Sequence, residues 1–286
     1  MNKKPLALFG LKWNPFSPDV PVEALFVTPE VRNFCWRVEN LVREGGFALI
    51  AGAPGLGKSI AMRLVAERLA SLRDVVVGAI EHPRSRTADF YRELAHIFGV
   101  PLAPHNRWGG FKALRDKWHA HIESTTVRPV LLIDEAQEMP PPAFAELRLL
   151  ASSHFDSRSL LTVVLVGDHR LPELLRSDEL LPLASRLRVR LTVEPASKET
   201  LRQMLEHLLE QAGNPKLMTP ELINTLCDHA AGNYRLLCTT ANELLNAGVQ
   251  REVKQLDEKL YLEVFSPGPD RARKPPAQTK MALTAR

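Results

Sequence analysis

The chain has 286 residues, of which 45% are hydrophobic and 24% charged, with a formal net charge of +4. This composition is typical of a globular protein and allows one large α/β domain with a smaller second domain. No apolar run reaches the roughly 18–20 residues of a membrane-spanning helix. Three scattered cysteines form neither a metal-binding spacing nor a disulfide framework. We therefore expect a reduced, cytoplasmic protein that does not cross a membrane.

The net charge comes from the C-terminal tail. Residues 266–286 contain five basic side chains and a single acidic one, Asp270, so the rest of the chain is balanced. Affinity for nucleic acid would have to come from a local patch or from this tail. Four prolines and few apolar residues predict that the tail is disordered. It could bind DNA, hold a partner, or serve solubility alone.

Helices and short apolar strands are expected to alternate up to residue 195. After a proline-rich, extended lead at 1–29, the predicted helices lie at 30–43, 58–72, 87–98, 110–122 and between Pro142 and Leu150. The predicted buried strands lie at 47–51, 75–80, 130–133, 161–166 and 187–191. This alternation predicts an α/β fold, a parallel sheet flanked by helices.

Beyond residue 195 the patterns are helical only. They cover 198–212, 219–230 and 234–247, and Ser197 and Thr219 are suited to cap the first two helices. We therefore divide the chain into the lead at 1–29, an α/β nucleotide-binding domain at 30–195, a small helical lid at 196–265 and the basic tail at 266–286.

A phosphate-binding loop follows the first strand. The residues that match G-x-x-x-x-G-K-[ST] are Gly52, Ala53, Pro54, Gly55, Leu56, Gly57, Lys58 and Ser59, and Ile60 continues into the helix. Glycines let backbone N–H groups converge on phosphate, and the helix directs its N-terminus at the anion. A chance glycine-rich turn is the alternative, but the flanking strand and helix are the context that the motif requires. We expect Lys58 to bind the β- and γ-phosphates of ATP, and Ser59 to bind Mg²⁺.

The third strand ends in two carboxylates, Asp134 and Glu135. Ligands of open α/β sheets bind at the carboxyl ends of the strands. We expect Asp134 to hold Mg²⁺ and Glu135 to polarise the water that attacks the γ-phosphate, which makes the chain a Mg²⁺-dependent ATPase. The alternative for these two residues alone is a solvated acidic turn.

Several segments resemble the ExeA-type AAA+ ATPases, over nearly all of residues 9–250. They are Phe9–Phe16, Gly46–Gly52, Asp134-Glu135-Ala136-Gln137, Glu146–Leu150, Val164–Asp168, Ser185-Arg186-Leu187 and Gly232-Asn233-Tyr234-Arg235. The resemblance implies the AAA+ P-loop fold with a C-terminal helical lid. It also implies that Phe16 and Trp13 of the lead lie near the adenine, although both could simply pack the lead onto the core.

The same resemblance assigns roles to three further residues. Asp168 takes the sensor-1 position, where relatives more often carry Gln or Asn, and a carboxylate there would repel the γ-phosphate unless it orients water or pairs with a base. Arg186 takes the arginine-finger position and would reach the ATP of a neighbouring subunit. Arg188 and Arg190 are its rivals, and a solvated basic strand face is the alternative for all three. Arg235 resembles sensor 2, or is an ordinary exposed arginine.

Two functions are populated in this branch of AAA+ proteins. Soluble regulators of the TnsC, TniB and MuB kind assemble on DNA with ATP, as rings or helical filaments, and recruit a transposase for target-site selection, together with a target-selection protein. Secretion-pathway ATPases act on a protein partner, and they carry a membrane anchor and a cell-wall-binding domain. Because the sequence shows neither part after the lid, we expect the transposition role. A nucleotide switch that does not hydrolyse ATP is a third possibility, and Glu135 argues against it.

Contacts with duplex DNA are expected to be mainly to phosphates, and hence independent of sequence and sensitive to salt. In related assemblies the segments after the second strand face the DNA. The candidates from these segments are Arg84, Arg86, Arg107 and Lys112. Solvated loop charges are the alternative for all four. His119 and His121 do not share a helix face, so they predict no metal site.

Overall fold

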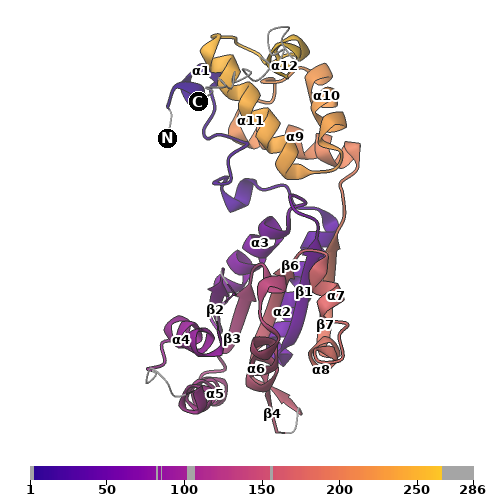
Figure 1. The fold of residues 1–286 in the computed structure, drawn as a ribbon. Coiled ribbons are helices and arrows are strands. Elements are labelled where there is room, and N and C mark those ends of the chain that lie inside the picture. Colours follow the sequence, from indigo (N-terminus) through magenta and orange to yellow (C-terminus); the bar gives the residue numbers. More distant parts are fainter. Residues whose placement is uncertain (1–2, 82, 85, 102–106, 155–156, 266–286) are drawn as a thin grey trace, which may run out of the picture.

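The computed structural model describes residues 3–81, 83–84, 86–101, 107–154 and 157–265. Its main sheet has five parallel strands in the order β2-β3-β6-β1-β7 (Figure 1). They are β1 (Gly46–Gly52), β2 (Val75–Ile80), β3 (Arg128–Ile133), β6 (Thr162–Gly167) and β7 (Leu187–Val193). A short antiparallel pair, β4 (Ser152–Ser153) and β5 (Arg158–Ser159), lies outside this sheet. The parallel sheet confirms the predicted fold class.

The helices fall into two groups along the chain. Those before residue 195 are α1 (Lys3–Phe9), η1 (Val22–Ala24), α2 (Pro29–Glu44), α3 (Lys58–Ala70), α4 (Thr87–Ile97), α5 (Arg107–Ser124), η2 (Ala136–Glu138), α6 (Pro141–Ala151), α7 (Arg170–Leu174) and α8 (Leu181–Ala184). Those after it are α9 (Lys198–Ala212), α10 (Pro220–Ala230), α11 (Tyr234–Gln250) and α12 (Glu258–Phe265). In the part of the chain described above, no helix is long and apolar enough to cross a bilayer.

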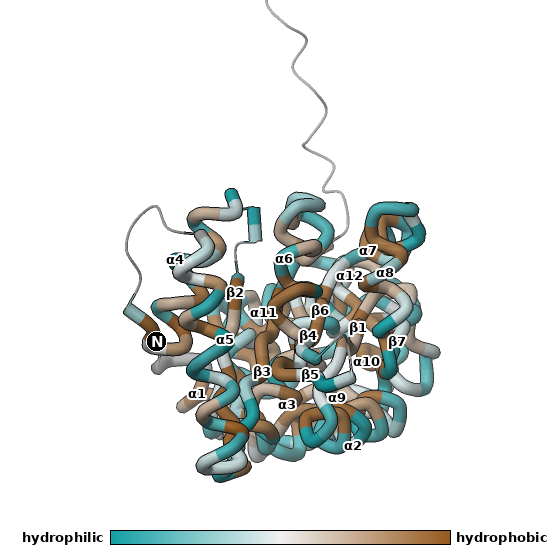
Figure 2. The backbone as a smooth tube through the Cα atoms, turned by 90° about the horizontal axis from the view of Figure 1, so that it is seen from below, coloured by the Kyte–Doolittle hydropathy of each residue, from teal (hydrophilic) through white to brown (hydrophobic). Residues whose placement is uncertain are grey.

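Alternate strand residues point into two separate cores. On one face of the sheet, Ala48, Ile50 and Leu132 pack against α2 and α3. On the other face, Phe47 and Leu131 pack against α4, α5 and α6. Figure 2 shows the brown strands between these layers, with α2 and α3 on one side and α4, α6 and α7 on the other. The burial of both faces explains why these strands are continuous apolar runs in the sequence.

Strand β2 differs from the expectation of a buried strand. It lies at the edge of the sheet and pairs only with β3 among the described strands, so Val76 is 39% exposed. Its apolar run Val75-Val76-Val77 resembles that of a central strand. An edge position depends on the strand order, which hydrophobicity alone does not determine.

The C-terminal helices form a third core, and the N-terminal lead belongs to it. Phe9, Leu11 and Phe16 are buried among residues of α9, α10 and α11, and Figure 1 shows α1 beside these helices. The backbone N–H of Lys12 donates to the carbonyl of Ala212 at 2.9 Å. The sequence predicts a lead that is extended throughout. The structure differs, because Lys3–Phe9 is helical and covers the lid.

The lid helices begin where their caps predict. Ser197 accepts a hydrogen bond from the N–H of Thr200 and Thr219 accepts one from Leu222, which satisfies donors that a helix start leaves free. The terminal helix α12 has no counterpart among the predicted elements. The predicted disordered tail, 266–286, lies outside the described residues.

Candidate nucleotide site

The loop between β1 and α3 has the backbone of a phosphate cradle. Gly55 and Gly57 have φ angles of +82° and +97°, a region that side chains disfavour. A Cβ atom at Gly55 would also collide with the side chain of Asn233. Helix α3 starts at Lys58, so its free N–H groups face the loop. The residues present therefore fit a bound phosphate chain.

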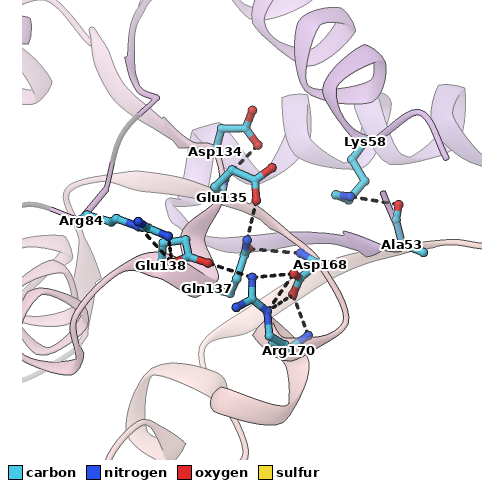
Figure 3. A network of polar contacts seen from close by, with 9 residues as sticks. All are labelled: Ala53, Lys58, Arg84, Asp134, Glu135, Gln137, Glu138, Asp168 and Arg170. Carbon is cyan, nitrogen blue, oxygen red and sulfur yellow. Dashed lines mark hydrogen bonds and ion pairs between the residues drawn. The ribbon is translucent and has the colours of Figure 1, made fainter. Parts of the chain in front are cut away.

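Lys58 lies inside the loop rather than in solvent. The residue is 8% exposed, and its Nζ donates to the carbonyl of Ala53 at 3.1 Å (Figure 3). Burial lowers the pKa of Lys58 below the ordinary lysine value, while the charges of Glu135, Asp168 and Asp134 act in the opposite direction. A cation with one carbonyl partner among acidic neighbours is suited to bind phosphate oxygens.

Asp134 and Glu135 follow β3 at the same edge of the sheet. Burial raises the pKa of Asp134, and a hydrogen bond from the N–H of Glu135 to Asp134 Oδ1, at 2.9 Å, opposes that shift. Glu135 has a left-handed backbone, with φ of 48°, and this turn directs its side chain away from the strand. Figure 3 shows the two carboxylates on one side and Lys58 on the other. With the hydroxyl of Ser59 at the start of α3, Asp134 provides the oxygen ligands that Mg²⁺ prefers.

Asp168 does pair with a base. Its carboxylate accepts hydrogen bonds from Arg170 Nε, the shorter at 2.9 Å, and from the N–H of Arg170 at 2.8 Å. Partial burial raises the pKa of Asp168, but the hydrogen bonds and charge of Arg170 outweigh it, so the pKa lies below the ordinary value. This pairing offsets the repulsion that an isolated carboxylate would exert on a phosphate.

Arg170 extends the network to a third loop. Its Nη2 also binds Glu138 Oε1 at 2.8 Å, and the other oxygen of Glu138 accepts two hydrogen bonds from Arg84 (Figure 3). Hydrogen bonds from both arginines lower the pKa of Glu138. Charge-assisted hydrogen bonds thus join the three segments that follow strands β2, β3 and β6.

The lid contacts the phosphate loop directly. The Asn233 side chain donates to the carbonyl of Pro54 at 3.2 Å, and the backbone N–H of Arg235 donates to the carbonyl of Gly55 at 3.1 Å. Asn233 also caps α11 by accepting from the N–H of Leu236. The exposed Arg235 acts electrostatically on Lys58, whose pKa it lowers. The residue assigned to sensor 2 therefore lies beside the loop.

Arg186 lies far from this site. It precedes β7, whose first residue, Leu187, pairs with Phe47 at the start of β1, whereas Val193 at its end pairs with Gly52. Six residues of strand separate the two edges of the sheet by about 20 Å, more than an arginine side chain spans. Arg186 donates to the carbonyl of Pro182. Its guanidinium cannot reach the phosphate loop of its own chain.

The two rivals of Arg186 lie on the same strand. Arg188 forms an ion pair with Glu44 at 2.6 Å, while Arg190 is exposed two residues further along. A paired arginine has to break that contact before it can serve a neighbouring site. Arg190 is therefore more readily available to a second subunit than Arg188.

The candidate DNA contacts are dispersed. Arg84, with its side chain 78% exposed, and Arg86 lie between β2 and α4, whereas Lys112 is exposed on α5. Arg107 begins α5, and its side chain lies outside the described residues. Arg84 also forms an ion pair with Glu138, so it is not an isolated loop charge.

The lead residues expected near adenine pack into the lid. Phe16 is buried in the core of the C-terminal helices, and Trp13 is partly buried against the same core. Packing of the lead accounts for both side chains.

Four residues of the site were not singled out from the sequence. They are Gln137, Glu138, Arg170 and Asn233. Gln137 stands within the D-E-A-Q segment and Asn233 within Gly-Asn-Tyr-Arg, so the resemblance contained both, without a role. No local pattern indicates Glu138 or Arg170, since their contacts depend on which strands are neighbours.

Comparisons with known proteins agree with this geometry. Residues 42–175 match the family described as AAA domain. General secretion pathway protein A of Aeromonas hydrophila is 28% identical over 248 residues, which covers 85% of this chain and 44% of that protein. The chain thus spans less than half the length of this relative.

Solved structures of low sequence identity share the fold. Cdc6p from Pyrobaculum aerophilum has a TM-score of 0.68 at 16% identity, covering 85% of this chain and 67% of that one. Drosophila ORC bound to DNA has a TM-score of 0.68 at 18% identity, covering 91% and 64%. Domain III of the Thermotoga maritima replication initiation protein DnaA has a TM-score of 0.58 at 20% identity, covering 87% and 96%. The chain therefore has the AAA+ P-loop NTPase fold and is related in sequence to general secretion pathway protein A.

Proposed function

We propose that this chain is a Mg²⁺-dependent ATPase. The observation that carries the proposal is the position of Lys58 opposite Glu135 and Asp134, where β1 and β3 end. Bound Mg²⁺ supplies positive charge that stabilises the triphosphate and its transition state. Ser59 and Asp134 hold the ion, Lys58 binds the β- and γ-phosphate oxygens, and Glu135 orients and polarises the attacking water.

We propose further that hydrolysis requires a second copy of the chain. Arg186 lies at the opposite edge of the sheet from its own phosphate loop, so in a head-to-tail assembly it serves the site of the next subunit. Such an arginine stabilises the charge of the transition state and makes hydrolysis depend on assembly. Arg235 and Asn233 connect the lid to the loop, so nucleotide binding and the lid position are coupled.

The function that we propose for the assembly is regulation of DNA transposition. The chain forms a ring or filament on duplex DNA with ATP, and recruits a transposase and a target-selection protein. The resemblance to the ExeA-type AAA+ ATPases, a branch that includes transposition regulators, supports this role. The fold also recurs in the DNA-bound structures of Drosophila ORC and Aeropyrum pernix ORC1. Exposed Arg84, Arg86 and Lys112 are the described residues that we assign to phosphate contacts.

Secretion is the second candidate function. The relative from Aeromonas hydrophila is named general secretion pathway protein A, and it matches most of this chain. In that case the ATPase acts on a protein partner, and DNA is not its ligand.

Negative-stain imaging distinguishes the two. The protein is mixed with duplex DNA at low salt and a non-hydrolysable ATP analogue, then with ADP, and Lys58→Ala is compared with Lys216→Ala, an exposed lysine of the lid. Rings or filaments that need the triphosphate, and that only Lys58→Ala abolishes, support the transposition role. Bare DNA beside protein that still binds the analogue rejects the DNA function and favours the secretion role.

A further inference from the structure

Gln137 is fixed between the catalytic turn and the end of β6. Its Oε1 accepts the backbone N–H of Asp168 at 3.2 Å, and its Nε2 donates to Glu135 Oε2 (Figure 3). A backbone N–H can pair only with the oxygen of the amide, which settles the orientation of the side chain. The nitrogen must therefore face Glu135.

The backbone leaves room for this amide. A Cβ atom at Gly167 would lie 2.5 Å from Gln137 Oε1, so a side chain at position 167 would displace the Gln137 amide. The left-handed backbone of Glu135 starts the short helix η2, which carries Gln137 two residues later. Both features place Gln137 beside Glu135, at a point where the amide also reaches a neighbouring strand.

We propose that Gln137 is a positioning residue for Glu135, an inference that rests on the proposed ATPase activity. By donating to Oε2, Gln137 holds the carboxylate in one orientation and leaves Oε1 to the attacking water. The hydrogen bond between Oε1 of Gln137 and the Asp168 backbone restrains rotation of the donor. A carboxylate fixed in this way is preorganised to orient water.

Two substitutions separate this role from a purely structural one. Gln137→Glu keeps the size of the side chain and the acceptor for the Asp168 N–H, but it removes the donor to Glu135. Gln137→Met removes both hydrogen bonds. The matched control is Gln203→Glu on α9, where Gln203 Nε2 donates to Glu199 Oε1 at 3.1 Å, away from the phosphate loop.

Steady-state ATP hydrolysis by the full chain with Mg²⁺ is measured beside binding of a non-hydrolysable analogue and thermal unfolding. We expect both Gln137 variants to lower kcat at least about tenfold. Analogue affinity should change less than about threefold, and Gln203→Glu should match the wild type. Loss of kcat in both variants, with binding retained, assigns the effect to the missing N–H donor.

Three results overturn the inference. If Gln137→Glu hydrolyses ATP like the wild type while Gln137→Met does not, the tether to Asp168 is all that matters. If both variants are as fast as the wild type, Gln137 has no part in the reaction and the ATPase activity still stands. If the wild type binds the analogue and assembles but never hydrolyses ATP, the proposed function fails, and the role of Gln137 fails with it.

Discussion

The two edges of the central sheet differ in the charged residues that they carry. The carboxyl edge brings together Lys58, Asp134, Glu135 and Asp168, and hydrogen bonds of Gln137 join the segments that follow β3 and β6. The amino edge carries Arg186, which donates a hydrogen bond to the carbonyl of Pro182. One edge holds the residues that we propose for nucleotide binding and attack, and the other holds an arginine that cannot reach the phosphate loop of its own chain.

This difference is the basis of our proposal that the carboxyl edge binds nucleotide within one chain, whereas rapid hydrolysis requires a second chain. Residues that bind and orient are fixed by local turns, such as those at Gly55 and Glu135. Arg186, the residue that we propose to stabilise transition-state charge, is separated from them by the length of β7. On this proposal, assembly is the step at which hydrolysis can be regulated.

The largest expected effect belongs to Arg186→Ala. We expect hydrolysis by the assembled protein to fall about 10³-fold, because an arginine finger contributes on that scale, with analogue binding unchanged. Arg188→Ala, which removes the ion pair with Glu44, is the matched control and should have a small effect. ATPase assays over a range of protein concentration measure both. If Arg186→Ala remained active and Arg190→Ala did not, the finger would be reassigned to Arg190.

Glu135→Gln tests the carboxyl edge. The amide keeps the shape of the side chain but cannot polarise water, so we expect kcat to fall about 10²-fold while analogue affinity stays within a few fold. Glu173→Gln on α7 serves as a surface control. Single-turnover hydrolysis measures the chemical step. If Glu135→Gln hydrolysed ATP at the wild-type rate, Glu135 would have no part in the mechanism.

The contact between lid and loop predicts a difference between two helix caps. Asn233→Ala and Ser197→Ala each remove an N-cap, so each should lower the free energy of unfolding by about 1 kcal/mol. Only Asn233 also binds the Pro54 carbonyl, so only Asn233→Ala should weaken ATP binding, by about five- to tenfold. Thermal unfolding and nucleotide titration separate the two quantities. Equal affinities in both variants would mean that the lid contact is incidental.

The smallest expected effect is on stability and depends on pH. Because burial raises the pKa of Asp134, the folded state keeps a proton that the unfolded chain releases between the ordinary aspartate pKa and the raised one. The free energy of unfolding therefore falls as pH rises through that window. Asp134→Asn should raise Tm by about 1–3 °C at pH 7, and the gain should disappear below the ordinary aspartate pKa. Asp178→Asn at an exposed position is the control, and it should change neither the Tm at pH 7 nor its dependence on pH. A lower Tm for Asp134→Asn at pH 7 would contradict the burial argument.

The sequence predicts most of the fold because its signals are local. Apolar runs mark all five strands, and glycines with a lysine mark the loop before α3. The start of α9 follows from Ser197. The helix α1 was missed because it is seven residues long and gains its stability from burial against the lid. Such tertiary stabilisation leaves little trace in periodicity.

The site divides in the same way. Lys58, Asp134 and Glu135 are predictable because motif and strand end coincide in the sequence. The Arg84–Glu138–Arg170 network is not, since its members come from three connections that become neighbours only when β2, β3 and β6 adopt their order in the sheet. The repulsive Asp168 becomes understandable only with Arg170 beside it.

A mixing experiment tests most directly whether the two edges of different chains form one site. Arg186→Ala and Glu135→Gln, each nearly inactive, are combined in equal amounts with ATP and Mg²⁺ at a protein concentration that favours assembly. Random mixing places the intact Arg186 edge of one variant against the intact Glu135 edge of the other at about a quarter of the interfaces. We predict recovery of about a quarter of the wild-type rate. A mixture no more active than the separate variants, although they co-assemble, would contradict a site shared between chains.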